Sequence, residues 1–329
     1  MNFSVLISGG AGYIGSATVK YFLDKGASVV VIDNLVTGHI EAIDKRAIFY
    51  EGDFSDKNLI ELIIKRHNIN SAMHFSAFAL VGESVENPAK YYENNVAKTI
   101  IFLETLAKNN VKYFIFSSTA ATFGIPDRMP IDETFEQKPI NPYGRSKLMV
   151  EEILKDFANA YDFHYGILRY FNACGALDDI GEDHNPETHI IPNIIKTALD
   201  ENKVFKIFGN DYPTKDGTCV RDYIHIKDLA SAHYLTLEYI MKNNKSEDFN
   251  LGNGKGFSNL EILHAAEKVI GQKINYEFTN RRPGDPPVLI ASSKKINNLL
   301  GWKPEFDSIE KIIESAYKWH KKYPEGYKK

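Results

Sequence analysis

The sequence predicts an α/β protein built on a doubly wound parallel sheet, with a second, smaller domain. In the first half, short apolar runs alternate with amphipathic helical stretches, which indicates parallel strands joined by helices. A glycine-rich segment follows the first apolar run directly. After residue 172, Gly, Pro, Asp and Asn become frequent, which is typical of loops. We therefore expect two domains, residues 1–172 and residues 173–329, with some segments of the second returning to the first.

Each strand of the first domain is expected from a short, fully apolar run, which is typical of a sheet covered on both faces. These runs are residues 3–8, 28–32, 47–50, 71–75 and 113–116. Helical periodicity lies between them, at residues 14–25 and around residues 58–66, and a long helix is expected after Pro88. The segments GALDDIGEDHNPETH and FGNDYPTKDGT are predicted loops of the second domain, and loops of this length are usually functional.

The composition excludes several classes of function. The 329 residues carry a net charge of -4, so the sequence has no polybasic footprint for nucleic acid or an anionic membrane. No apolar stretch approaches the roughly 20 residues that a membrane-spanning helix needs. The sequence begins without a signal-peptide pattern, and Cys174 and Cys219 form neither a disulfide framework nor a metal motif. We expect a cytoplasmic protein with two reduced thiols.

The glycine-rich segment lies where a dinucleotide-binding turn is expected. It opens the first helix directly after the first strand, and glycines there permit a tight turn and close approach of the backbone to a pyrophosphate. The spacing allows two interpretations, Gly10-x-Gly12-x-x-Gly15 or Gly9-x-x-Gly12-x-x-Gly15, and the glycines alone do not decide between them. Either one, between a strand and a helix, predicts a Rossmann-type domain.

The acid at the end of the second strand indicates which dinucleotide binds. Asp33 lies 18 positions after Gly15, close to the roughly 20 expected for a carboxylate that accepts hydrogen bonds from the ribose hydroxyls. This carboxylate would repel a 2′-phosphate, and no arginine follows it directly, so NAD is favoured over NADP. Asp53 also follows a strand, but taken alone it is interpreted as a turn residue.

A tyrosine and a lysine four positions apart form the candidate catalytic pair. Tyr143 and Lys147 follow Pro142, which is typical of a helix start, so both side chains are expected on one helical face. A nearby ammonium and a positive nicotinamide ring would lower the pKa of the tyrosine, ordinarily about 10, toward neutrality. Thr119, at the end of the fifth strand, would supply a hydroxyl near Tyr143. The same spacing occurs at three other places, so the position beside this strand distinguishes the pair.

Longer motifs run through nearly the whole chain. They include SGGAGYIGS and NPYGRSKLMVEEIL, and the more distinctive LRYFNACGA, IFGNDYPTKDGTCVRDYIH, FNLGNG and RRPGDPP. Together they resemble the extended short-chain dehydrogenase/reductases, and most of all the UDP-glucose 4-epimerases. The resemblance implies that tightly held NAD+ takes a hydride from C4 of a UDP-hexose while Tyr143 removes the O4 proton, with Thr119 relaying it. The 4-keto sugar would then turn in the pocket, and the hydride would return to its opposite face.

The resemblance also implies two sets of binding residues. The NAD site would contain Gly9, Gly12, Tyr13, Ile14, Gly15, Asp33, Asn34, Asp53, Phe54, Phe75, Ser76, Ala77, Asn94, Tyr143, Lys147, Tyr170 and Phe171. The UDP-sugar would contact Thr119, Asn172, Phe208, Arg221, Tyr223, Arg282, Asp285 and Leu289. In the second set, Arg221 and Arg282 would hold the diphosphate through paired hydrogen bonds, and Phe208 would pack on the uracil.

Two further expectations come from the resemblance. Leu289 stands where some members of the family carry a tyrosine beside the sugar. The smaller side chain would leave room for a 2-acetamido group, so we hypothesise that UDP-GlcNAc and UDP-GalNAc are also substrates. The resemblance further suggests a homodimer, formed through helices near residues 91–107 and 146–159.

Particular residues favour or disfavour the alternative functions. A nucleotide-sugar 4,6-dehydratase would need an Asp-Glu pair after the strand-end hydroxyl, whereas Ala120 and Ala121 follow Thr119 here. Epimerisation of a UDP-uronate or a UDP-pentose stays open. A non-catalytic regulator that binds NAD is disfavoured, because Tyr143 and Lys147 are both present.

One group of acidic and histidine residues lies in the first predicted loop of the second domain. It consists of Glu182, Asp183, His184, Glu187 and His189. We interpret this segment as a mobile loop, and the family pattern accounts for it without an ion. The sequence analysis therefore predicts no metal site.

Overall fold

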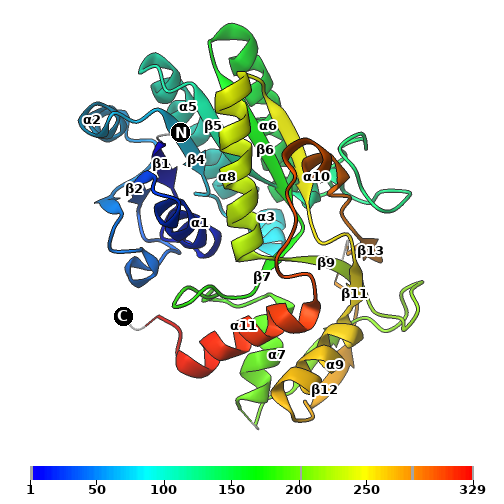
Figure 1. Ribbon diagram of the computed structural model, residues 1–329. Helices are drawn as coiled ribbons and strands as arrows, with labels where there is room; N and C mark the ends of the chain where they lie inside the picture. The colour runs from blue at the N-terminus through cyan, green and yellow to red at the C-terminus, as the bar shows by residue number, and fades with distance from the viewer. Residues whose placement is uncertain (1–2, 201, 283–284, 328–329) are drawn as a thin grey trace.

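The computed structural model describes residues 3–200, 202–282 and 285–327. They form a large sheet with helices on both faces and a smaller unit of short strands and helices, which lies below the sheet in Figure 1. The N-terminus lies beside the large sheet, and the C-terminus lies beside the smaller unit. Among the described residues, no helix combines the length and the apolar character needed to span a membrane.

The large sheet contains seven parallel strands in the order β10-β6-β5-β4-β1-β2-β3. They are β1 (Ser4–Ser8), β2 (Ser28–Asp33), β3 (Ile48–Glu51), β4 (Ser71–His74), β5 (Tyr113–Thr119), β6 (His164–Tyr170) and β10 (Glu247–Leu251). The order 3-2-1-4-5-6 within this sheet is that of a Rossmann fold, and it reverses direction between β1 and β4. The predicted doubly wound sheet is confirmed, and every strand expected from an apolar run is present.

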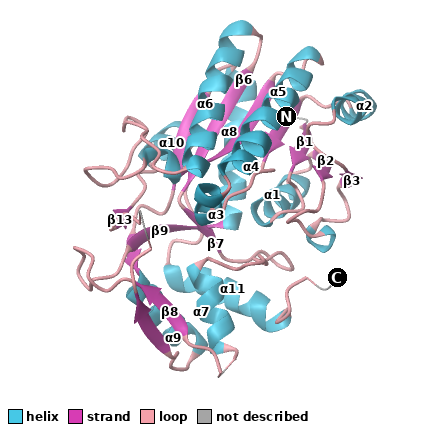
Figure 2. Ribbon diagram, turned by 180° about the vertical axis from the view of Figure 1, so that it is seen from behind, coloured by secondary structure: helices cyan, strands magenta, loops and turns pink. Residues whose placement is uncertain are grey.

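Helices cover both faces of this sheet, as Figures 1 and 2 show. One face carries α1 (Tyr13–Asp24) and α8 (Ile226–Asn243); the other carries α2 (Lys57–His67), α5 (Lys98–Lys108) and α6 (Pro142–Ala160). Alternate residues of each strand enter the two apolar cores, so Val5 and Ile7 lie in one core and Leu6 in the other. Because both faces are buried, the strands are continuously apolar rather than alternating.

Local signals set the ends of the helices that matter for the site. α6 begins where the side chain of Asn141 accepts the amide of Gly144 at 2.8 Å and Pro142 takes the first helical position. The long helix expected after Pro88 consists of α4 (Pro88–Tyr92), the π-helical segment η2 (Glu93–Ala97) and α5. π-Helical segments often lie at functional sites, and this one contains the predicted NAD contact Asn94.

The smaller unit contains a mixed sheet, a two-stranded sheet and a helical layer. The mixed sheet joins β7 (Asn172–Cys174), β9 (Val220–His225), β11 (Gly256–Ser258) and β13 (Val288–Leu289). The two-stranded sheet joins β8 (Phe205–Phe208) and β12 (Tyr276–Thr279). Helices α7 (Ile190–Ala198), α9 (Asn259–Ile270) and α11 (Ile309–Lys322) enclose a third apolar core. Long loops at residues 175–189 and 209–219 connect these elements.

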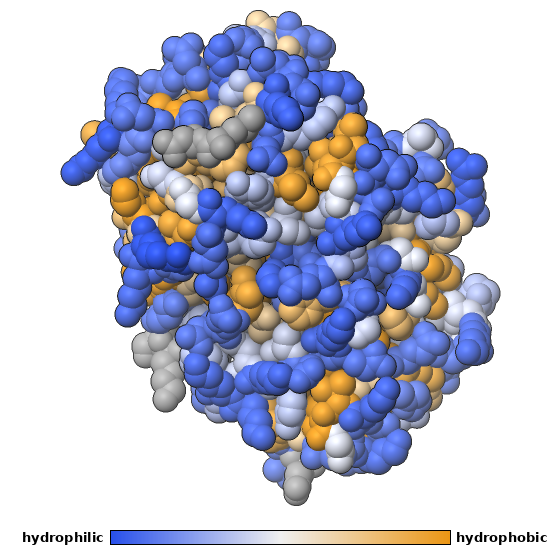
Figure 3. Space-filling view, viewed as in Figure 1, coloured by the Kyte–Doolittle hydropathy of each residue, from blue (hydrophilic) through white to orange (hydrophobic). Residues whose placement is uncertain are grey.

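The chain crosses between the two units more than once. After β9, it returns through α8 to the large sheet, where β10 pairs with β6 as an edge strand. The buried carboxylate of Asp222 on β9 ties the crossings together, because it accepts the amides of Asn253, Gly254 and Ala291 at 2.8–3.0 Å. Segments beyond residue 172 therefore belong to the large sheet. The face shown in Figure 3 is mostly hydrophilic, with its apolar residues in separate patches.

Candidate functional site

The glycine turn after β1 is tightly packed on one side and open on the other. Gly9 has φ +77, and a Cβ at Gly15 would lie 2.1 Å from the Gly9 carbonyl oxygen, so both positions require glycine. A Cβ at Gly12 would meet nothing closer than 3.4 Å. Gly12 is the N-cap of α1 and has no side chain to cap it, which leaves backbone amides of the first turn for an anion. This geometry fits the pyrophosphate of a dinucleotide.

Asp33 lies at the end of β2, and the backbone holds its carboxylate. One oxygen accepts the amide of Ala11 at 3.0 Å, and the other accepts the amide of Leu35 at 2.9 Å. Burial raises the pKa of this carboxyl, while the two amide bonds oppose the rise. Each oxygen has a second lone pair, so the fixed carboxylate can also accept ribose hydroxyls.

The other residues predicted to contact NAD follow neighbouring strands along the same edge of the sheet. Asn34 follows β2, Asp53 and Phe54 follow β3, Phe75, Ser76 and Ala77 follow β4, and Tyr170 and Phe171 lie at the end of β6. Ligands bind at this edge in parallel sheets. The ring of Phe54 is 4% exposed and packs against His74 in the apolar core, so only the Phe54 backbone is available to a cofactor.

The predicted catalytic residues meet between α6 and the end of β5. Tyr143 and Lys147 lie on one face of α6, as their spacing predicts. Lys147 Nζ donates a hydrogen bond to the carbonyl oxygen of Ser117 at 2.7 Å and lies 4.8 Å from the centre of the Phe116 ring. The side chain of Thr119 lies close enough to Tyr143 to lower the pKa of its phenol. The fold thus brings all three residues to one point on the nucleotide-binding edge.

The electrostatics of this pair differ from the expectation drawn from the sequence. Burial raises the pKa of the Tyr143 phenol, and Thr119 is the group that opposes the rise. Lys147 is 3% exposed, and burial lowers its pKa to about 7 because a desolvated ammonium is disfavoured. Its ammonium is directed at Ser117 rather than at the phenol. The spacing identified the pair, but it could not indicate that the lysine is buried and engaged by β5.

The residues predicted to bind the substrate gather on the mixed sheet. Asn172 pairs with Tyr223 across β7 and β9, and Arg221 pairs with Leu289 across β9 and β13. The guanidinium of Arg221 forms an ion pair with Asp285 at 3.2 Å, in the loop that precedes β13. Residues that are more than a hundred positions apart in the chain therefore lie together on one small sheet.

A second pair lies at the end of the two-stranded sheet. The guanidinium carbon of Arg282 lies 4.1 Å from the centre of the Phe208 ring, which is a cation–π contact. Arg282 is exposed, whereas Arg221 is largely buried. Arg221 and Arg282, both predicted to bind the diphosphate, are thus already in contact with Asp285 and Phe208. A bound diphosphate would compete with these two side chains for the arginines.

Two features of the site were not expected from the sequence. Lys98 forms an ion pair with Asp53 at 2.6 Å. Lys98 lies four positions after Asn94, so the sequence alone could have placed it on the same helical face as that predicted NAD contact. His39 and Tyr327 stack with ring centres 4.9 Å apart and line a cavity of about 50 Å³ beside Gly12. No local signal could place Tyr327 there, because only the fold brings the end of the chain to the turn after β1.

Known proteins share this architecture and its residues over almost the full length of the chain. Residues 5–252 match the NAD dependent epimerase/dehydratase family. A UDP-glucose 4-epimerase of Streptococcus mutans serotype c is 53% identical over 328 residues, which cover 98% of each chain. The chain belongs to the NAD dependent epimerase/dehydratase family. Membership confirms the prediction of NAD as the cofactor, which rested on the glycine turn and Asp33.

Solved structures agree with this membership. A UDP-glucose 4-epimerase from Brucella ovis in complex with NAD has a TM-score of 0.92 at 43% identity, covering 97% of this chain and 98% of that chain. A UDP-Glc/GlcNAc 4-epimerase from Campylobacter jejuni has a TM-score of 0.85 at 44% identity, covering 98% of this chain and 100% of that chain. This family member therefore has the complete fold of a nucleotide-sugar epimerase.

Proposed function

We propose that this protein is a UDP-glucose 4-epimerase that interconverts UDP-glucose and UDP-galactose. The observation that carries the proposal is the meeting of Tyr143, Lys147 and Thr119 at the carboxyl end of β5, the edge of the parallel sheet that also carries the glycine turn. Full-length identity with relatives of that name supports it. NAD, when bound, supplies hydride acceptance and return at C4 of the sugar.

The residues on α6 and β5 transfer the proton of the sugar O4 hydroxyl. In this proposal, Tyr143 removes that proton as a general base, and the neighbouring Thr119 hydroxyl relays it to the phenol. Because burial raises the pKa of Tyr143, the phenolate needs positive charge nearby. The Lys147 ammonium supplies part of that charge, and its bond to Ser117 keeps it at the end of β5.

The nucleotide is held at the mixed sheet. Arg221 and Arg282 grip the diphosphate, and Phe208 packs against the uracil once Arg282 has turned toward the phosphates. Asn172 fixes further polar groups of the nucleotide, and its side-chain amide already donates to the Asp222 carbonyl oxygen at 2.8 Å. Because these contacts are made to UDP and not to the sugar, the sugar is free to turn and to present either face of C4.

A product assay by NMR tests the proposal directly. Purified protein receives UDP-galactose and UDP-GalNAc in separate tubes, with no NAD added. Formation of UDP-glucose in the first tube is the expected result. If UDP-galactose is unchanged even after NAD+ is added, the proposal fails, and the same assay with UDP-glucuronate and UDP-xylose then identifies the alternative nucleotide sugar.

We also propose that the N-acetylated UDP-hexoses are substrates. Leu289 is partly buried on β13 and lies opposite Arg221, so its side chain borders the space next to the diphosphate ligands. The Campylobacter jejuni relative, named for both UDP-Glc and UDP-GlcNAc, supports this breadth. Conversion of UDP-GalNAc in the second tube is the expected result, and conversion of UDP-galactose alone would remove this part of the proposal.

The protein is further proposed to act as a homodimer in the cytoplasm. Apolar side chains are exposed on three neighbouring helices, α3 (Val81–Glu86), α5 and α6: Val85 is 63% exposed, Ile100 40% and Met149 41%. Exposed apolar side chains on adjacent helices are typical of interaction surfaces, which supports a two-fold interface here. Both cysteines are buried and unpaired, which supports a reducing compartment. Light scattering should give twice the chain mass, and I100D should shift it to that of one chain.

A further inference from the structure

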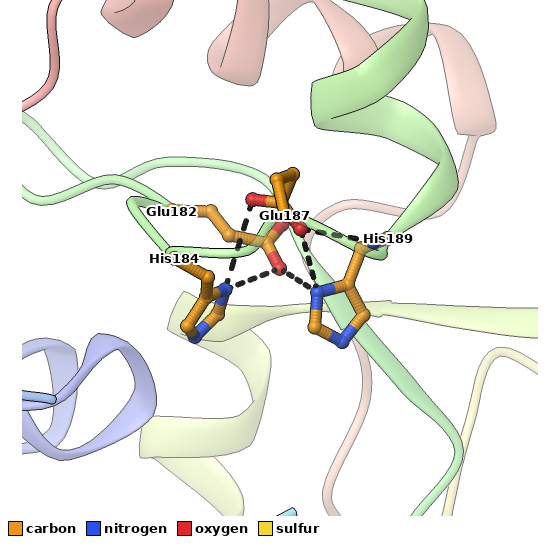
Figure 4. A group of neighbouring side chains, drawn as sticks. All are labelled: Glu182, His184, Glu187 and His189. Carbon is orange, nitrogen blue, oxygen red and sulfur yellow. Dashed lines mark hydrogen bonds and ion pairs between the residues drawn. The ribbon is translucent and has the colours of Figure 1, made fainter. Parts of the chain in front are cut away.

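The loop that leads into α7 gathers two glutamates and two histidines around one point (Figure 4). Glu182, His184, Glu187 and His189 each offer one oxygen or nitrogen atom, and these four atoms all lie within 4.8 Å of one another. His189 is the N-cap of α7, and the other three residues precede it on the loop. None of them has a part in the proposed epimerisation, so the cluster needs an explanation of its own.

The separations between neighbouring donor atoms approach those of a tetrahedral zinc site, and the four donor atoms all lie within 4.8 Å of one another. Nδ1 of His189 lies 2.8 Å from Oε1 of Glu182 and 3.0 Å from Oε1 of Glu187. Nδ1 of His184 lies 3.4 Å from Oε1 of Glu182 and 3.7 Å from Oε2 of Glu187. Zinc bonds of about 2.0–2.1 Å to imidazole and carboxylate place tetrahedral ligand atoms roughly 3.3 Å apart. The observed separations lie on both sides of that value.

Hydrogen bonds within the cluster leave two of its atoms without a partner. The side chain of Glu187 is 6% exposed, and its Oε2 is enclosed without a hydrogen bond. Nδ1 of His184 is also enclosed without a hydrogen bond. Enclosed polar atoms of this kind are costly, and each imidazole Nδ1 carries at most one hydrogen to share between two carboxylates. A cation at the centre would contact all four side chains at once.

The charges also favour a divalent ion. The carboxylates of Glu182 and Glu187 are 4% and 6% exposed, so two negative charges lie close together away from water. Buried charges of one sign need a counter-charge, which either the two paired imidazoles in their protonated form or one divalent cation would supply. Two nitrogen donors among four ligands disfavour Ca²⁺ and Mg²⁺, which prefer oxygen, and favour zinc.

We propose that Glu182, His184, Glu187 and His189 bind a structural Zn²⁺ ion that fastens this loop beside the dinucleotide turn. All four ligands come from the protein, which is the pattern of a closed, non-catalytic zinc site. From the sequence, these four residues and Asp183 are expected in a mobile loop without an ion. The fold gives that loop a fixed conformation in which the four donor atoms converge.

One ligand of the proposed ion, His184, also contacts the glycine turn. His184 directs Nδ1 at the cluster, while its ring packs edge-on against Tyr13 with the ring centres 6.0 Å apart. Tyr13 is the first residue of α1, and its hydroxyl donates to the carbonyl oxygen of Gly175 at 2.5 Å. His184 also lines the small cavity beside Gly12. An ion that holds His184 would therefore slow the opening of this loop and the release of NAD.

Metal analysis of the untagged, full-length protein tests the proposal. We expect about one zinc per chain by mass spectrometry, and, after chelation, visible absorption typical of tetrahedral Co²⁺ when Co²⁺ alone is added. Zn²⁺ should raise the Tm of the chelated protein by about 5 °C, and Mg²⁺ should not. His189→Ala is the test variant, because this side chain is 46% exposed and its loss leaves the core intact. It should retain less than about a tenth of the zinc.

His264→Ala is the matched control. His264 is also an exposed histidine, 3.3 Å from a glutamate oxygen of Glu267, but it lies on α9 outside the cluster. It should bind zinc like the unmodified protein. Zinc content that is unchanged in His189→Ala, or a chelated protein that shows neither Co²⁺ bands nor a Tm rise with Zn²⁺, would overturn the site. Equal NAD release rates for the chelated and zinc-loaded proteins would overturn the link to the turn. Each readout is independent of epimerase activity.

Discussion

The two sides of the proposed active site hold their functional residues in different ways. Along the edge of the large sheet, Asp33 and Lys147 are fixed by backbone groups, the amides of Ala11 and Leu35 and the carbonyl of Ser117. These partners belong to strands and turns that do not move independently. On the mixed sheet and its neighbouring loops, the two predicted phosphate-binding arginines each contact another side chain, and Arg221 also donates to the carbonyl oxygen of Val220.

The pairs on the mixed-sheet side are of a kind that can exchange. Arg221 pairs with Asp285, and Arg282 lies over Phe208. A diphosphate can replace a carboxylate or an aromatic ring as the partner of a guanidinium, whereas nothing in a ligand replaces the strand that carries Ser117. The difference indicates a preformed cofactor side, suited to permanent binding, and an adaptable substrate side, suited to turnover.

The largest effect is expected at the fixed edge, from Tyr143→Phe. Loss of the phenolic hydroxyl should lower kcat by about 10³-fold or more, because it removes the proposed general base. NAD should stay bound, since the ring and the backbone partners remain. The measurement is turnover of UDP-galactose together with the absorbance of retained cofactor. Tyr21→Phe is the control, because Tyr21 and Lys25 have the same spacing on α1 and should tolerate the change.

Gly15→Ala breaks the preformed turn itself. The new Cβ would lie 2.1 Å from the carbonyl oxygen of Gly9, so the turn must shift. We expect the free energy of unfolding to fall by about 3 kcal/mol, as in other overpacked sites, and bound NAD to be lost on gel filtration. Gly82→Ala is the control, because its Cβ would meet nothing within 4 Å. An alanine at position 15 that keeps its NAD would show that the cofactor side is not preformed.

Arg221→Gln tests whether substrate binding depends on the mixed-sheet side of the site. It should raise the KM for UDP-galactose by about 10- to 100-fold, because a charge-assisted hydrogen bond to phosphate is lost. The retention of NAD should not change, since Arg221 lies on β9 and not on the large sheet. Arg66→Gln, at an exposed position on α2, should leave KM unaltered. A loss of NAD in the Arg221 variant would mean that the two sides are not independent.

The smallest effect is expected from Leu289→Tyr. The larger ring should fill the space proposed for a 2-acetamido group and lower the ratio of UDP-GalNAc to UDP-galactose conversion by about 10-fold. Leu299→Tyr, on an exposed position of α10 (Lys294–Leu300), should leave the ratio unchanged. Equal losses on both substrates would exclude Leu289 as a determinant of specificity.

The sequence predicted the fixed edge far better than the adaptable side. The glycine turn, Asp33 and the Tyr143–Lys147 spacing are local patterns, and a parallel sheet follows from the alternation of strands and helices. The pairing of Arg221 with Asp285 depends on loops that no local rule specifies. The pKa of Lys147, lowered to about 7, depends on burial, which spacing cannot reveal.

The zinc cluster illustrates the same limit. Its four ligands lie within eight consecutive residues, so the residue types were visible in the sequence. Their interpretation as a mobile loop followed from composition. Convergence of the four donor atoms is a property of the folded loop and the start of α7.

The return of β10 to the large sheet has a consequence for how the chain is made. A ribosome that has released β1 to β6 has produced six of the seven strands, but the outer edge of β6 stays unpaired until residue 251 emerges. At roughly 5–20 residues per second, that interval lasts about 4–16 s. Throughout it, the unpaired parallel edge of β6 is open to pairing with other nascent chains. A chain truncated after residue 172 would keep that edge exposed permanently, and we expect it to aggregate.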